Sequence, residues 1–181
     1  MVNDFVVRYL VFSIFISLII LSGCHSQSGG HEHGSHYAGQ EKREIKALSD
    51  EDIKNLQEGN GMGFAKVAEL NGFPGPKHIL ENEAELNLSK EQKQAVEKSF
   101  NEMKTQAKEL GGKVIEKEKQ FDVLFQQNKI ENAEMLRSKT EEIAKLKGDL
   151  RSVHLAAHLE MKKVLSSEQI EQYKKLRGYS N

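Results

Sequence analysis

Apolar residues recur at alternating intervals of three and four positions through the second half of the chain, which is the spacing of one helix face. One such series begins at Val96 and a second begins at Leu136. The polar residues 128–132 separate the two series. Two long amphipathic helices joined by a short turn pack antiparallel. The pattern therefore predicts a long antiparallel helical hairpin over about 90–164.

The first apolar series keeps its phase across Gly111 and Gly112. Two adjacent glycines cost about 2 kcal/mol relative to alanine in a helix interior. The unbroken phase nevertheless predicts one helix from about 90 to 127. The glycine pair indicates either a hinge or a close contact with another helix, and the sequence leaves both interpretations open.

Shorter helices are expected on either side of this hairpin. Ser49 and the acidic residues after it favour a helix start, and Gly59 interrupts that helix. A short segment follows over 62–70, and Pro76 suits the first position of a helix running to about Leu86. A last short helix follows the hairpin.

The composition agrees with a helical protein. Aromatic residues make up 7% of the 181 residues, with no Trp and two Pro, which favours an all-α fold over a β-sandwich. We therefore expect one α-helical domain over 49–181. The net charge of −1 argues against a nucleic-acid partner. Without a phosphate-binding loop or a hydrolase motif, the chain is not expected to be an enzyme.

The first residues have the layout of a secretory signal. The stretch 9–21 is apolar and uncharged, but as a helix it would rise only about 20 Å, short of a ~30 Å hydrocarbon core. Arg8 precedes it and small residues follow it, which is typical of a signal peptide over 1–23. An uncleaved membrane anchor with an incidental cysteine is the alternative.

The single cysteine directly follows this signal, in Leu-Ser-Gly-Cys24. This resembles the bacterial lipobox, which implies lipidation of Cys24 and its exposure as the mature N-terminus. The protein would then be anchored to a membrane by lipid and lie in the periplasm. His25 follows the cysteine, and resemblance to enterobacterial lipoproteins implies the outer rather than the inner membrane.

A flexible His-rich tether is expected over 24–48. Residues 25–40 are mostly Gly, Ser, Gln and His, without apolar periodicity. Imidazole binds Zn, Cu and Ni, so the tract predicts either a weak metal-capturing tail or a polar spacer. Its four histidines are His25, His31, His33 and His36.

One short motif occurs twice, at the starts of two helices. Leu88-Ser-Lys-Glu-Gln92 recurs as Leu165-Ser-Ser-Glu-Gln169. In each copy a serine, Ser89 or Ser166, and a glutamine form a capping-box pattern that satisfies free N–H groups. With the signal and the hairpin, the pair resembles the LTxxQ motifs of the Spy/CpxP superfamily of periplasmic stress proteins, with Ser in place of Thr. The resemblance covers roughly residues 77–178.

This superfamily also contains zinc-resistance-associated proteins and periplasmic heavy-metal sensors. The resemblance implies a small all-α protein without enzymatic activity, often a homodimer whose hairpins interlock into a helical bundle. Its members act as ATP-independent holdases of unfolded client proteins, as inhibitors of sensor kinases, or as metal-binding sensors.

Candidate metal ligands lie on the second long helix. His154 and His158 are four residues apart on one face, and Met161 follows on the same side. Such a set suits Cu, Ni or Co better than Mg or Ca. In the metal-sensor members of this superfamily, His and Glu residues from an N-terminal segment complete the site. This chain has no His pair at helical spacing there, and the nearby substitute is His78 with Glu81, Glu83 or Glu85. Alternatively, His154 and Met161 are packing residues and His158 is solvated.

Two functions follow from these observations. The first is a periplasmic metal-responsive stress protein that senses or sequesters a transition-metal ion, with Zn, Cu, Ni and Co as candidates. The alternative is an envelope chaperone or sensor-kinase regulator without a specific metal role. Clients would then contact exposed apolar residues, and the candidates are Met62, Phe64, Phe73 and Met103. Heptad spacing favours a core position for Met103.

Overall fold

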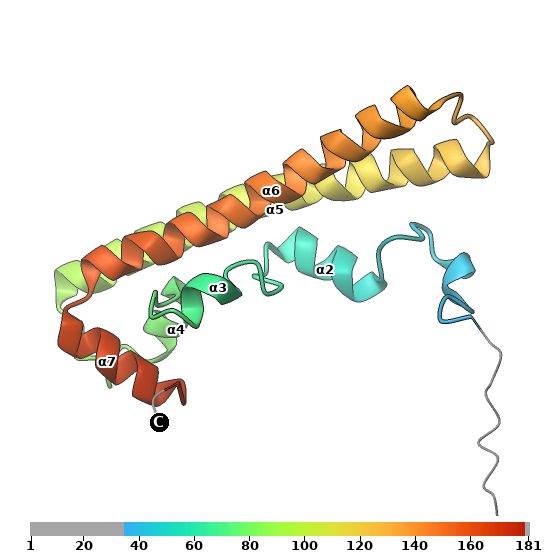
Figure 1. Ribbon diagram of the computed structural model, residues 1–181. Coiled ribbons are helices and arrows are strands. Elements are labelled where there is room, and N and C mark those ends of the chain that lie inside the picture. Colours follow the sequence, from blue (N-terminus) through green and yellow to red (C-terminus); the bar gives the residue numbers. More distant parts are fainter. Residues whose placement is uncertain (1–34, 180–181) are drawn as a thin grey trace, which may run out of the picture. The chain divides into compact units, whose positions relative to one another are not determined.

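A computed structural model of the chain describes residues 35–179, and its packed helical unit begins at Gly39. The described residues form helices and turns without strands, so the all-α prediction is confirmed. The elements in chain order are the 3₁₀ turn η1 (Gln40–Lys42), α2 (Asp50–Glu58), α3 (Lys66–Glu69), α4 (Pro76–Glu81), α5 (Lys90–Gln126), α6 (Ala133–Val164) and α7 (Ser167–Leu176). Figure 1 shows α5 and α6 as an antiparallel pair, with α2, α3 and α4 along one side of it.

The hairpin forms where the apolar series predict it. The Ser89 hydroxyl accepts a hydrogen bond from the Gln92 amide N–H, and the Gln92 side chain accepts one from the Ser89 amide, which completes the capping box at the start of α5. The Asn132 side chain caps α6 by accepting from the Met135 amide. The prediction of two long helices over about 90–164 is therefore confirmed.

The two central glycines have different surroundings. Gly111 is buried where α2 crosses α5, and a Cβ atom built there would lie 2.3 Å from the Leu56 carbonyl oxygen. The same atom built on Gly112 would meet nothing within 4 Å. Because α5 is continuous through both residues, Gly111 marks a close helix contact rather than a hinge, and Gly112 faces open space.

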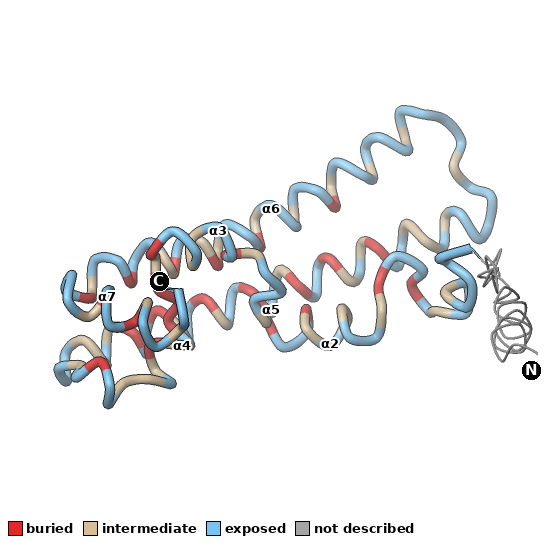
Figure 2. Tube along the Cα trace, turned by 60° about the horizontal axis from the view of Figure 1, so that its bottom comes forward, coloured by how far each residue is buried: buried red, intermediate tan, exposed pale blue. Residues whose placement is uncertain are grey.

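Two hydrophobic clusters hold the unit together. The first joins α4, α6 and α7 to the start of α5, and its buried members are Ile79, Leu86, Val96, Met161, Leu165, Ile170 and Tyr173. The second joins the N-terminal segment and α2 to the middle of the hairpin, and its buried members are Ile45, Leu48, Leu56, Ala107, Val114 and Leu150. Figure 2 shows these buried positions as red segments, whereas the hairpin end near the turn is largely exposed.

The boundaries differ from the sequence prediction at three places. Ile45 and Leu48, assigned to the tether, are buried in the second cluster, so the packed unit begins earlier than residue 49. The helix begun by Pro76 ends at Glu81 rather than near Leu86, because the Asn82 side chain donates to the His78 carbonyl at 2.7 Å and ends it. In the segment 62–70 only α3 is helical.

The two copies of the Leu-Ser-x-Glu-Gln motif, at 88–92 and 165–169, are hydrogen-bonded to each other. The Gln92 side-chain amide donates to the Val164 carbonyl at 2.9 Å and to the Gln169 amide oxygen at 2.8 Å. The Gln169 amide donates in return to the Leu86 carbonyl at 3.1 Å and to the Gln92 amide oxygen at 3.0 Å. This reciprocal pair, here called the glutamine clasp, joins the starts of α5 and α7. Both copies of the motif therefore take part in one contact.

Within residues 35–179, each helix is too short or too polar to traverse a lipid bilayer.

Candidate functional site

A cavity of about 430 Å³ lies beside the two helices of the hairpin, and the segment between α2 and α4 forms its other wall. The loop 59–63 and the start of α4 form part of its wall. Helix α5 contributes Phe100, Met103 and Lys104, and α6 contributes His154 and His158. A cavity of this volume is in the range of small-molecule sites in proteins.

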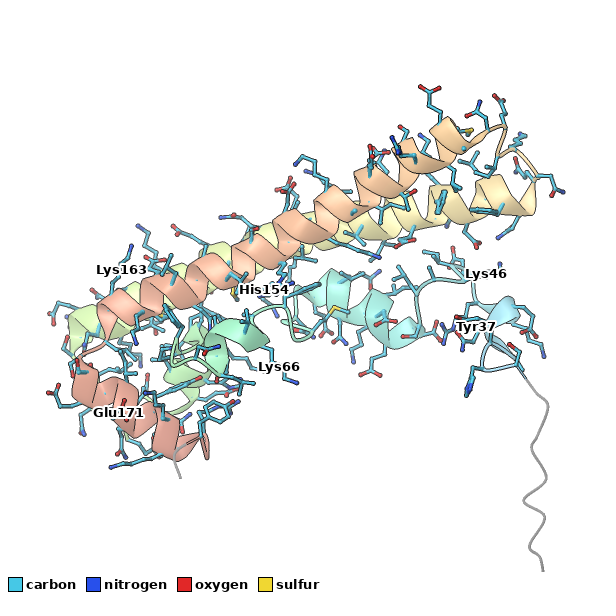
Figure 3. All side chains as sticks on the ribbon, viewed as in Figure 1. Tyr37, Lys46, Lys66, His154, Lys163 and Glu171 are labelled. Atoms are coloured by element: carbon cyan, nitrogen blue, oxygen red, sulfur yellow. The ribbon has the colours of Figure 1, made fainter. Side chains whose placement is uncertain are left out.

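His154 is buried in the wall of this cavity. Its side chain lies on α6, on the side that faces the segment after α2 (Figure 3), and the residue is only 3% exposed. The imidazole stacks on the Phe64 ring with 5.7 Å between centroids. Its Nε2 atom has no hydrogen-bond partner in the described part of the chain. Burial, helped by the nearby His158 and Lys104, lowers the pKa of His154 to about 4. The ring is therefore neutral at neutral pH.

His158 lies one helical turn further along α6. Its Nδ1 is 2.8 Å from the Phe73 carbonyl oxygen, and because a carbonyl only accepts, Nδ1 carries the proton. The ring packs directly against Gly75, where a Cβ atom would lie 2.9 Å from the His158 Cε1 atom. Glycine at this position therefore leaves room for the imidazole.

Glu69, at the end of α3, faces His158. Its Oε1 atom accepts from the Tyr173 hydroxyl at 2.6 Å and from the Arg177 side chain at 3.3 Å. Its Oε2 atom is buried without a hydrogen-bond partner and lies 3.6 Å from His158 Nδ1. Sequence reasoning missed Glu69. It is the only acidic residue between Glu58 and Glu81, a signal that could have drawn attention to it.

Three predicted ligands share this cavity and one does not. His78, His154 and His158 all contribute to its lining. His78 is hydrogen-bonded through Nδ1 to Glu81 Oε2 at 2.7 Å, and this bond lowers the pKa of the Glu81 carboxyl. Met161 is 0% exposed and packs in the first hydrophobic cluster instead.

The remaining predicted site residues belong to the tether. Cys24, His25, His31 and His33 lie outside the described residues, and His36 lies outside the packed unit that begins at Gly39. Within the described range, no three His, Cys, Asp or Glu side chains are gathered closely enough to hold a metal ion.

The buried imidazole predicts a loss of stability in mild acid. His154 is neutral in both states above its unfolded pKa of 6.5, but between pH 6.5 and about 4 only the unfolded chain takes up the proton. Stability therefore falls as the pH drops through this window, by up to about 3 kcal/mol. The free energy of unfolding of metal-free protein can be measured with urea at pH 7.5 and at pH 4.5. Between these two pH values the wild type should lose about 2 kcal/mol more of it than His154→Phe does. Equal losses would contradict this role of His154.

Comparisons with protein-family models, with curated proteins and with solved structures find no match to this chain.

Proposed function

We propose that the protein is a metal-responsive stress protein of the bacterial periplasm, without enzymatic activity, which binds a transition-metal ion in the cavity beside α6. One observation carries the proposal. His154 Nε2 and Glu69 Oε2 are both buried, both lack a hydrogen-bond partner in the described residues, and both belong to residues that line one cavity. A buried polar atom without a partner is costly, and a bound ion is one way to satisfy it.

The chemistry of these atoms fits a transition metal. A neutral imidazole nitrogen and a carboxylate oxygen are ligands that Zn, Cu, Ni and Co accept. His158 and His78 line the same cavity. Because no three His, Cys, Asp or Glu side chains among residues 35–179 are grouped as a metal site, the proposal requires these side chains to move when the ion binds. His158 already donates through Nδ1 to the Phe73 carbonyl, the kind of bond that fixes the tautomer of a metal-binding histidine.

Several features of the proposal come from the sequence alone. They are the lipid anchor at Cys24, the location in the periplasm at the outer membrane, and assembly as a homodimer through the hairpins. The resemblance of Leu-Ser-Gly-Cys24 to the lipobox supports the anchor, and His25 after the cysteine supports the outer membrane. The resemblance to the Spy/CpxP superfamily supports the homodimer.

The chaperone alternative has weaker support in the packing of its candidate residues. Phe64 is occupied by stacking on His154, and the Lys162 ammonium lies over the Phe73 ring at 5.1 Å from its centroid. Met103 is buried. Of the four candidates only Met62 is exposed, so the metal function is the better supported of the two.

Calorimetric titration of the purified protein with Zn²⁺, Cu²⁺, Ni²⁺ and Co²⁺ tests the proposal. We expect at least one ion to bind more tightly than millimolar, and His154→Phe to weaken that binding by about tenfold or more. Phenylalanine keeps the stack on Phe64 and removes the nitrogen ligand.

A second variant separates the cavity from the tether. In it the four tether histidines are replaced, as His25→Ser, His31→Ser, His33→Ser and His36→Ser. The cavity site predicts that binding survives these changes. Binding that is lost with the tether histidines and unaffected by His154→Phe would assign the metal to the tether and overturn the cavity proposal.

A further inference from the structure

The cavity beside the hairpin has the size and the apolar wall of a site for a small organic molecule. Its volume of about 430 Å³ lies in the range in which proteins bind such ligands. Helix α5 contributes Phe100 and Met103 to the wall, and the loop after α2 contributes Met62. These three side chains offer an apolar surface to a carbon skeleton, which gains free energy by leaving water.

The same lining carries an excess of positive charge. Four basic residues line the cavity, against the single carboxylate of Glu69. That carboxylate is already occupied, because its Oε1 atom accepts from the Tyr173 hydroxyl at 2.6 Å and pairs with Arg177 at 3.3 Å. It therefore compensates one of the four positive charges and leaves the other three.

Two of these three charges have no counter-ion within the protein. Lys77 pairs with Glu81 at 3.8 Å. The other two residues, Lys66 and Lys104, have no ion-pair partner in the part of the chain that the structure describes. Positive charge in a recessed site attracts anions, so the lining favours a negatively charged ligand.

Lys104 is the better placed of the two lysines. Its ammonium donates to the Asn60 side-chain oxygen at 3.0 Å, which holds it beside the loop 59–63. Lys104 is half-buried, whereas Lys66 is exposed. Burial lowers the pKa of Lys104, because the charged ammonium has lost part of its hydration. An anionic group bound here would replace that hydration with a charge-assisted hydrogen bond.

We infer that this cavity binds a small organic anion, in which a carboxylate is attached to an aromatic or aliphatic skeleton. Lys104 pairs with the carboxylate, and Met62, Phe100 and Met103 contact the skeleton. This anion site goes beyond the proposed metal function and does not rest on it. The anion fits the side chains where they lie, whereas the metal ion requires them to move.

Equilibrium dialysis of the metal-free protein with three probes tests the inference. The probes are naphthoate, the neutral naphthamide of the same shape, and acetate, which carries the charge without the skeleton. We expect naphthoate to bind at least about tenfold more tightly than naphthamide, in keeping with one charge-assisted contact. Acetate should bind at least about tenfold more weakly than naphthoate, because it buries little apolar surface.

Three variants assign the binding to the cavity. Lys104→Met keeps the apolar stem and removes the charge, so naphthoate should then bind no more tightly than naphthamide, whose own binding should not weaken. Lys98→Met removes an exposed charge of α5 outside the lining and is the matched control, which should change neither. Met62→Asn should weaken both naphthalene probes by about threefold or more. Asparagine tolerates the φ of 44° at this position, so the loop is preserved.

Four results would overturn the inference. If naphthamide binds as tightly as naphthoate, the cavity recognises no charge. If acetate binds as tightly as naphthoate, the site takes simple anions rather than organic ones. If Lys104→Met leaves naphthoate binding unchanged, or if no probe binds more tightly than millimolar, the cavity is not an anion site. Because the protein is free of metal throughout, each result is separate from the titrations that test the metal function.

Discussion

Replacing Gly111 with alanine is expected to destabilise the fold by about 3 kcal/mol or more, because the added methyl group would overlap with backbone atoms that cannot move aside without shifting a helix. The new methyl group would lie 2.3 Å from the Leu56 carbonyl oxygen and 2.9 Å from its carbonyl carbon. Both atoms belong to the backbone of α2, so no side-chain rotation can relieve the clash. Helix α2 must shift away from α5, and Leu56 then leaves the second hydrophobic cluster.

The adjacent glycine provides the matched control. Gly112→Ala places the same methyl group in open space, in the same helix. It should stabilise the protein by about 1 kcal/mol, since alanine favours a helix interior over glycine. Urea unfolding followed by circular dichroism should therefore separate the two variants by about 4 kcal/mol. Equal stabilities would show that α2 does not pack on α5 at this point.

The second large effect is expected from Gln92→Glu, with a loss of about 2–4 kcal/mol. Glutamate keeps the side-chain oxygen that accepts from the Ser89 amide, so the capping box at the start of α5 survives. It loses the amide group that donates to the Val164 carbonyl and to Gln169. The substitution therefore breaks the glutamine clasp without removing the helix cap.

Gln94→Glu on the same turn of α5 is the control, because this side chain is exposed and takes no part in the clasp. Chemical unfolding of the two variants at pH 7 provides the comparison. A loss for Gln92→Glu no larger than that for Gln94→Glu would mean that the motif serves only as a helix cap.

Much of the fold could be predicted because its determinants are local. Ser49, Ser89 and Ser166 each cap a helix through a partner three residues away, which sequence patterns reveal directly. The phase of the apolar residues likewise defined α5 and α6. Gly111 left two interpretations open, since only the crossing of α2 decides between them.

The candidate site was harder to predict because its contacts span the chain. The Glu69 carboxylate is held by Tyr173, 104 residues away, and no local pattern indicates that contact. The helical spacing of His154 and His158 did identify one wall of the cavity. The same spacing grouped Met161 with these histidines. In the structure the Met161 side chain packs in the first hydrophobic cluster instead, because burial of its apolar surface is favourable.

The glutamine clasp has a consequence for the order of folding. It joins residues 77 positions apart, whereas the turn between α5 and α6 joins near neighbours. Closing the longer loop costs more chain entropy, so the hairpin can form from its turn before the clasp closes. The cavity also draws its walls from distant segments. A chain that has made its two long helices would therefore still lack a binding site until these late contacts form.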